Sequence, residues 1–141
     1  MFGSLAAQLE ERAAADRPVR IGLVGAGRFG TSVAAQLGRM RGLRLEAVAD
    51  VRRSNAQAAL EAAGWDATDV QTTDNAALVR ERVHAGRAVI AEEASLLAEA
   101  PLDVVVEATG RPEVSARVIP GLLRAGIHVV NVTVEADVLL G

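Results

Sequence analysis

Val19-Arg20-Ile21-Gly22-Leu23-Val24-Gly25-Ala26-Gly27-Arg28-Phe29-Gly30 is the stretch of sequence that decides the fold. Its apolar first half predicts a buried β-strand, and the helix-patterned segment 31–40 follows the last glycine at once. The glycines have the spacing Gly-x-Gly-x-x-Gly, in which Gly25 allows a tight turn, Gly27 lets backbone approach a pyrophosphate, and Gly30 allows close helix packing. The strand before the motif and the helix after it predict a dinucleotide site with its phosphates at the helix N-terminus.

An acidic residue downstream supports this interpretation. Asp50 ends the apolar run 45–49, about 20 residues beyond the last glycine, where a carboxylate accepts hydrogen bonds from an adenosine ribose. Alternatively, Asp50 caps the helix that begins near Ser54. Arg52 and Arg53 follow, and their guanidinium groups would grip a 2′-phosphate that Asp50 would repel. The sequence therefore predicts NAD(P)H and leaves the choice between NAD and NADP open.

Two further segments complete the candidate cofactor site. Thr109 and Gly110 form a turn on the far side of the expected crevice, where Thr109 either donates a hydrogen bond to the cofactor or caps a helix. Arg28 and Phe29 belong to the glycine loop, and the Arg28 side chain either reaches phosphate or is solvated. The candidate cofactor-binding residues are thus Gly25, Gly27, Arg28, Phe29, Gly30, Asp50, Arg52, Arg53, Thr109 and Gly110.

The chain alternates short apolar strands with helical segments. Strands are predicted at 19–24, 45–49, 88–91, 103–107 and 128–132, helices at 4–15, 31–40, 54–63, 75–85, 92–99 and 113–125, and irregular structure at 65–74. This alternation predicts an α/β doubly wound parallel sheet of the Rossmann type, in the order 3-2-1-4-5, with an extra N-terminal helix. The β-branched run 103–107 predicts a strand buried on both faces.

The expected domain organisation has three parts. Residues 1–17 form a helical arm, residues 18–133 the dinucleotide-binding domain, and residues 134–141 the start of a connection to a missing catalytic domain. A small-molecule substrate would bind through that domain, which would also shield the hydride from water. We therefore expect hydride transfer by this chain alone to be undetectable.

Composition restricts the function classes. The 141 residues carry a net charge of −3, which argues against nucleic acid as a partner. No cysteine, signal peptide or apolar run of membrane-spanning length is present, so we expect a cytoplasmic protein without a membrane partner. All 15 basic residues are arginine and tyrosine is absent, so the catalytic residues remain unidentified.

The sequence also bears on metal binding and self-association. The carboxylates of Glu107, Glu135 and Asp137 fit no compact metal motif and are expected to be solvated, with no metal site. Apolar surface left by a missing domain would favour a homo-oligomer.

Three segments resemble a known family. The glycine stretch 19–30, Val105-Val-Glu-Ala-Thr-Gly-Arg-Pro-Glu-Val and Asn131-Val-Thr-Val-Glu-Ala-Asp are similar to the N-terminal domain of homoserine dehydrogenase-like oxidoreductases. The resemblance is greatest to the subgroup with a C-terminal SAF domain, which includes 1-deoxy-D-xylulose 5-phosphate reductoisomerase-like proteins. It implies an NAD(P)-dependent oxidoreductase in which the three glycines cradle the dinucleotide and Thr109 and Gly110 flank the nicotinamide. That subgroup uses NADPH and is expected to lack an acid at the position of Asp50, so this chain departs from the pattern.

A second function class remains open at this point. Nucleotide-sensing regulatory domains of potassium transporters and channels share the length, a Gly-x-Gly-Arg-Phe-Gly loop and an acid after the second strand. The N-terminal helix and the 107–110 turn favour the oxidoreductase domain.

Overall fold

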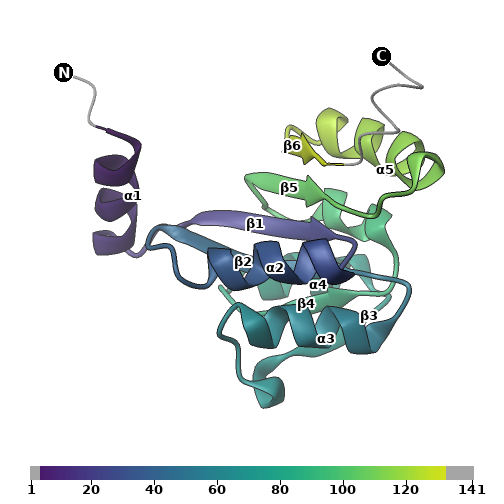
Figure 1. Ribbon diagram of the computed structural model, residues 1–141, viewed down its shortest axis with the longest axis horizontal. Helices are drawn as coiled ribbons and strands as arrows, with labels where there is room; N and C mark the ends of the chain where they lie inside the picture. Colours follow the sequence, from purple (N-terminus) through teal and green to yellow (C-terminus); the bar gives the residue numbers. More distant parts are fainter. Residues whose placement is uncertain (1–3, 133–141) are drawn as a thin grey trace.

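The computed structural model describes residues 4–132 and contains a six-stranded parallel sheet with helices on both faces (Figure 1). The strands are β1 (Val19–Val24), β2 (Leu43–Ala49), β3 (Gln71–Thr73), β4 (Val89–Ala91), β5 (Val104–Glu107) and β6 (His128–Asn131). Their order is β3-β4-β2-β1-β5-β6. The five predicted strands lie in the predicted order, and the doubly wound Rossmann arrangement is confirmed.

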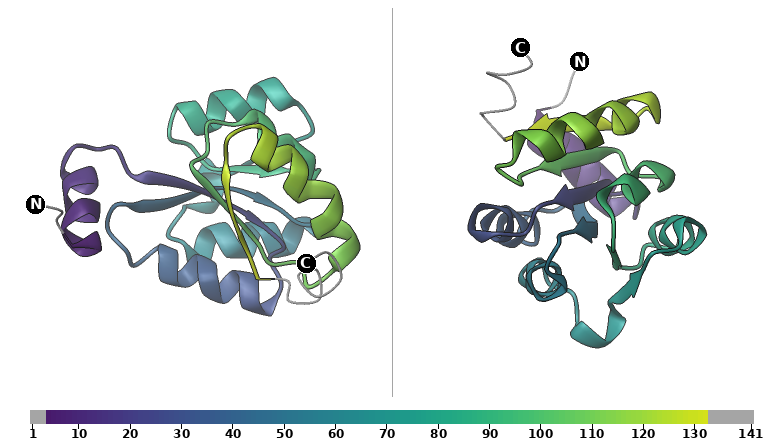
Figure 2. Two further views of the ribbon diagram at one scale, coloured as in Figure 1. Left: turned by 90° about the horizontal axis from the view of Figure 1, so that it is seen from above. Right: turned by 90° about the vertical axis from the view of Figure 1, so that its right-hand side faces the viewer.

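Helices from different parts of the chain cover the two faces (Figure 2). On one face, α2 (Arg28–Leu37) and α3 (Arg53–Ala62) enclose a core that includes Leu23, Leu45 and Leu60. On the other face lie α4 (Ala76–His84), the 3₁₀ helix η2 (Ala94–Glu99) and α5 (Pro112–Arg124), packed around Val83, Leu97 and Leu122. None of the helices within residues 4–132 is long and apolar enough to cross a membrane.

The structure corrects two local predictions. Residues 65–74 are not wholly irregular, because they contain the 3₁₀ helix η1 (Ala67–Asp69) and the edge strand β3, which pairs in parallel with β4. This strand is three residues long and lacks an apolar pattern, so its position depends on pairing rather than on local sequence. Helix α2 begins at Arg28, three residues before the predicted start, and therefore includes the third glycine of the motif.

The predicted N-terminal helix is present and stands apart from the sheet (Figure 1). In α1 (Leu5–Ala14), the Ser4 hydroxyl accepts a hydrogen bond from the Ala7 amide, and no residue of the helix is buried. An ion pair of 2.8 Å between Glu10 and Arg41 joins α1 to the loop before β2. The backbone of α1 also packs at Leu9 directly against Gly42, and Leu9 and Ala13 are half-buried, so the helix contacts the rest of the chain along one side.

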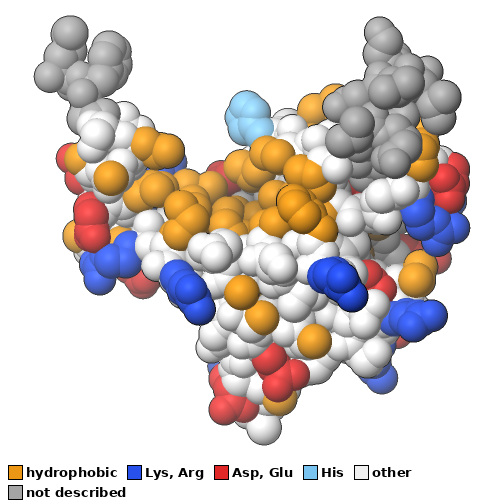
Figure 3. Space-filling view, viewed as in Figure 1, with side chains coloured by type: hydrophobic (Ala, Val, Ile, Leu, Met, Phe, Trp, Pro, Cys, Tyr) orange, Lys and Arg blue, Asp and Glu red, His pale blue; other side chains and the backbone are white. Residues whose placement is uncertain are grey.

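Strand β5 is buried on only one face, so the prediction of burial on both faces is wrong. Val105 and Glu107 point into the core beside α5, whereas Val104 and Val106 are half-buried. Val106 pairs with Val130 of β6, which is 49% exposed. The physical reason is that α2 and α3 cover β1, β2 and β4, and no described helix extends over β5 and β6 on that side. Figure 3 shows the resulting apolar patch over β1, β5 and β6.

Candidate functional site

A cleft of about 830 Å³ lies at the carboxyl ends of β1, β2, β4 and β5. Its volume falls within the range typical of small-molecule sites. Helix α2 follows β1 on one face and α5 follows β5 on the other, so the strand order reverses between these two strands. Ligands of open parallel sheets bind at this topological switch point.

The glycine motif forms the floor of the cleft. Gly25 has φ of +91°, and a Cβ added there would lie 2.7 Å from the backbone nitrogen of Thr109. A Cβ on Gly30 would collide with the carbonyl oxygen of Gly25, so this glycine lets α2 pack directly under the loop. A Cβ on Gly27 would meet no atom within 4 Å. The space beside Gly27 is therefore open to a group from outside the chain.

Helix α2 presents an uncapped N-terminus to this open space. Gly27 is the N-cap and makes no side-chain capping hydrogen bond, and the first turn carries no acidic residue. The first amides of a helix have no intrahelical acceptor, and the helix dipole favours negative charge beside them. Ser4 caps α1 and Asn75 caps α4 with side-chain oxygens, whereas α3 and α5 begin without a side-chain cap, as α2 does. The start of α2 is thus suited to an anion such as a pyrophosphate.

Asp50 is held at the edge of the cleft by two backbone amides. Its Oδ2 accepts from Ala26 of the glycine loop at 2.6 Å, and its Oδ1 accepts from Arg52 at 2.7 Å. Each carboxylate oxygen has a second lone pair, so both can still accept from a ligand hydroxyl. Asp50 is not the cap of α3, whose N-cap is Arg52.

The two arginines after β2 point to different places. Arg52 lines the cleft, whereas the Arg53 Nε donates to the Thr72 hydroxyl of β3 at 3.1 Å. The cleft lining thus includes five candidate residues, namely Gly25, Gly27, Asp50, Arg52 and Thr109. The other five lie outside it, namely Arg28, Phe29, Gly30, Arg53 and Gly110.

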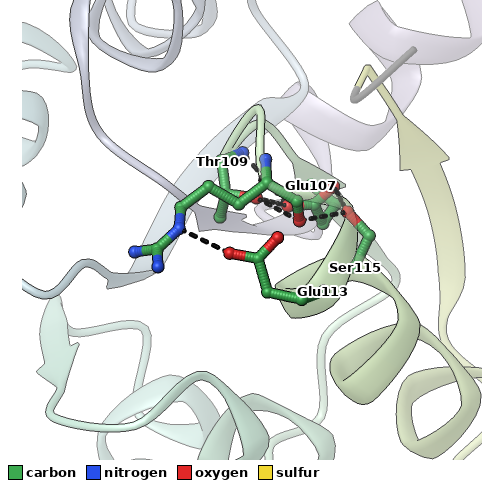
Figure 4. A network of polar contacts seen from close by, with 5 residues as sticks. Glu107, Thr109, Glu113 and Ser115 are labelled. Carbon is green, nitrogen blue, oxygen red and sulfur yellow. Dashed lines mark hydrogen bonds and ion pairs between the residues drawn. The ribbon is translucent and has the colours of Figure 1, made fainter. Parts of the chain in front are cut away.

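A buried polar network supports the opposite lip of the cleft (Figure 4). The Glu107 carboxyl group is fully buried and accepts hydrogen bonds from the Thr109 amide at 3.0 Å, the Thr109 hydroxyl and the Ser115 hydroxyl. The expectation that Glu107 is solvated is therefore wrong, because α5 folds over the end of β5 and covers it. Glu135, Asp137 and the predicted connection 134–141 lie outside the described residues. Thr109 is not the cap of α5 either, since the N-cap is Arg111.

The sequence did not single out several charged and polar residues of the cleft. Glu92, Glu93 and Ser95 follow β4, and Arg111, Glu113 and Arg117 belong to the start of α5. The only available signal was their position directly after predicted strands. The pKa of Glu113 lies below its usual value because its carboxylate accepts from its own amide and from Arg111, whose Nε is 2.9 Å away. This end of the cleft carries charges of both signs.

Comparisons with known proteins agree with this geometry. The family model for the homoserine dehydrogenase NAD-binding domain matches residues 25–138. No curated protein sequence matches the chain.

Solved structures that are similar to the chain include two dehydrogenases. Myo-inositol dehydrogenase from Lactobacillus casei, in complex with NAD(H) and myo-inositol, is 18% identical with a TM-score of 0.59, over 81% of this chain and 28% of that one. Scyllo-inositol dehydrogenase from the same organism is 20% identical with a TM-score of 0.55, also over 81% of this chain and 28% of that one. At these identities the similarity shows the fold, and the match spans under a third of either dehydrogenase.

Proposed function

The chain belongs to the family of homoserine dehydrogenase NAD-binding domains, and from that premise we propose that residues 18–133 bind NAD(H) in preference to NADP(H). The observation that carries the preference is the Asp50 carboxylate, which two backbone amides orient at the edge of the cleft. A carboxylate there accepts from both ribose hydroxyls and repels a 2′-phosphate.

The residues of the cleft fit a dinucleotide. The uncapped start of α2 and the open space at Gly27 suit the pyrophosphate, and Asp50 suits the adenosine ribose. Thr109 and Gly110 would flank the nicotinamide end, as the family resemblance implies. Arg28 and Phe29 would contribute the backbone amides of the first helical turn. When bound, the nicotinamide supplies hydride transfer.

The position of the arginines supports the same preference. Arg53 donates a hydrogen bond to Thr72 and does not line the cleft, so Arg52 is the arginine of this pair that a 2′-phosphate would meet, together with the opposing charge of Asp50. Arg52 is then free to bind phosphate elsewhere on the dinucleotide as a charged hydrogen-bond donor.

We further propose that the whole protein is a cytoplasmic oxidoreductase acting on a small oxygenated metabolite. The substrate would bind through a catalytic domain outside these residues, and the chain alone would bind cofactor without transferring hydride. The narrower resemblance to SAF-domain, reductoisomerase-like proteins stays a prediction. The family model is that of a dehydrogenase domain, which favours this proposal over a potassium-transport regulator. The apolar patch over β1, β5 and β6 (Figure 3) supports self-association, which sedimentation velocity would measure.

Titration of the 141-residue chain with NADH, NADPH and ATP tests the proposal. We expect NADH to bind more tightly than NADPH, and ATP to bind weakly. Asp50→Ala should weaken NADH binding about tenfold, because it removes a charged acceptor for the ribose, and should bring NADH and NADPH affinities closer together.

Asp74→Ala is the matched control, since Asp74 is exposed and outside the cleft lining. It should leave both affinities unchanged. A chain that binds neither dinucleotide would contradict the proposed function. An Asp50→Ala variant with an unaltered ratio of NADH to NADPH affinity would contradict the preference.

A further inference from the structure

The turn that forms the second lip of the cleft has its own internal support. Strand β5 ends at Glu107, which pairs with Val24 of β1 and Asn131 of β6. Backbone pairing continues only as far as the Ala108 amide, which donates to Val24 at 2.7 Å. The turn beyond Ala108 therefore leaves the ladder, and other interactions must hold it.

The Glu107 side chain supplies these interactions. One carboxyl oxygen accepts from both the amide and the hydroxyl of Thr109, and the other accepts from Ser115 of α5. The Thr109 hydroxyl in turn accepts from the Arg111 amide at 3.2 Å. Glu107 and Ser115 are both fully buried, and none of the ion pairs found within residues 4–132 involves Glu107. The carboxyl group thus joins the strand, the turn and the first turns of α5.

The same turn packs directly on the glycine loop. A Cβ on Gly25 would lie 2.7 Å from the Thr109 nitrogen and 2.8 Å from the Ala108 carbonyl carbon, so the two backbones are in contact. Thr109 and Arg111 both line the cleft. Any shift of the turn consequently changes the width of the cleft beside the first glycine.

We infer that Glu107 and Ser115 are positioning residues for the cofactor: buried beneath the cleft, they hold Thr109 and Arg111 against the glycine loop at the spacing that the dinucleotide requires. This inference rests on the proposed function of the cleft. Glu107 and Ser115 do not line the cleft themselves, so they would act on binding only through the turn. Preorganised sites depend on such supporting residues.

Affinity measurements on matched variants of the 141-residue chain test the inference. Glu107→Leu removes the acceptor of three hydrogen bonds at nearly constant volume, and we expect it to raise the Kd for NADH about tenfold. Glu107→Gln retains an acceptor for Thr109 and should recover most of the affinity. Ser115→Ala removes one donor and should change the Kd in the same direction by a smaller factor.

Glu46→Leu is the matched control. Glu46 is an equally buried carboxyl residue within β2 and does not line the cleft. It should leave the Kd for NADH unchanged. If Glu107 had only a structural role, its variants would have a lower unfolding midpoint than the wild type. Their affinity for NADH, measured well below that midpoint, would be unchanged.

Amide hydrogen exchange provides a readout that needs no cofactor. In the unliganded chain, the Thr109 and Arg111 amides should exchange more slowly in the wild type and Glu107→Gln than in Glu107→Leu or Ser115→Ala. If Glu107→Leu does not fold, Ser115→Ala decides the question.

The outcomes separate the two claims. A wild-type chain that binds no dinucleotide overturns the proposed function, whatever the amides show. A wild type that binds NADH together with a folded Glu107→Leu or Ser115→Ala variant of unchanged affinity overturns only the positioning role.

Discussion

Glu46 and Glu107 are both fully buried carboxyl residues, but their surroundings differ. Glu107 accepts hydrogen bonds with both oxygens. Glu46 Oε1 lies 3.3 Å from Arg44 Nε and 3.7 Å from Arg20 Nε, while its Oε2 has no hydrogen-bond partner. The strand register shifts here, since Ile21 pairs with Leu45 and Gly22 with Ala47, leaving Glu46 as the extra residue of a β-bulge. Burial raises the pKa of Glu46, and the two arginines only partly oppose this effect.

The raised pKa of Glu46 leads to a prediction about stability and pH. The folded state holds the Glu46 proton more tightly than the unfolded state, whose pKa is near 4.5. The stabilising contribution is therefore complete below that pH and is lost as pH rises through the higher folded pKa. Glu46→Gln cannot ionise, so it should remove this loss and raise the free energy of unfolding at neutral pH relative to the wild type.

Urea unfolding at a series of pH values measures the effect. Glu61→Gln, an exposed substitution on α3, controls for the change in net charge. Equal pH dependence in the Glu46→Gln and Glu61→Gln proteins would show that the burial of Glu46 has no such consequence.

At the scale of elements, β1, α2 and β5 pack together through the glycine loop that joins β1 to α2. Gly30 allows α2 to pack under the loop, and Gly25 allows the loop to touch the turn after β5. The motif predicted both the strand and the helix because glycine spacing, apolar patterning and helix start are local properties. The edge strand β3 was not predictable in this way, because it is stabilised by pairing with β4.

Substitution of two glycines separates packing from binding in this part of the fold. Gly30→Ala places a methyl group against the Gly25 carbonyl and should destabilise the fold by about 1–3 kcal/mol, as overpacking generally does. Gly27→Ala meets open space at φ of −72° and should leave the unfolding free energy nearly unchanged while weakening NADH binding. Denaturant unfolding and NADH titration of both variants check this. Unaltered NADH affinity in Gly27→Ala would mean that no ligand approaches there.

At the scale of the whole molecule, the cleft exists only when the sheet is assembled. Its lining comes from the ends of β1, β2, β4 and β5, with α3, η2 and α5 around them. A ligand held by all these segments binds the folded chain and not the unfolded one. NADH at about 100 times its Kd should therefore stabilise the fold by about 2.7 kcal/mol.

Thermal unfolding with increasing NADH measures this linkage. The midpoint should rise with NADH concentration in the wild type and should rise less in Asp50→Ala at the same concentrations. If the midpoint stays constant at NADH concentrations well above the measured Kd, NADH does not bind to the cooperatively folded part of the chain.

The sequence by itself determined the Rossmann class, the order of the five predicted strands and the nature of the glycine loop. These depend on apolar periodicity, turn residues and short-range spacing, which are local properties of the sequence. Tertiary structure alone decided which candidate residues share the cleft. It turned Arg53 toward Thr72, buried Glu107 beneath α5, and left Val104 and Val106 only half-covered. Such outcomes depend on contacts between residues far apart in sequence, because burial and hydrogen-bond partners are set by what packs against a side chain.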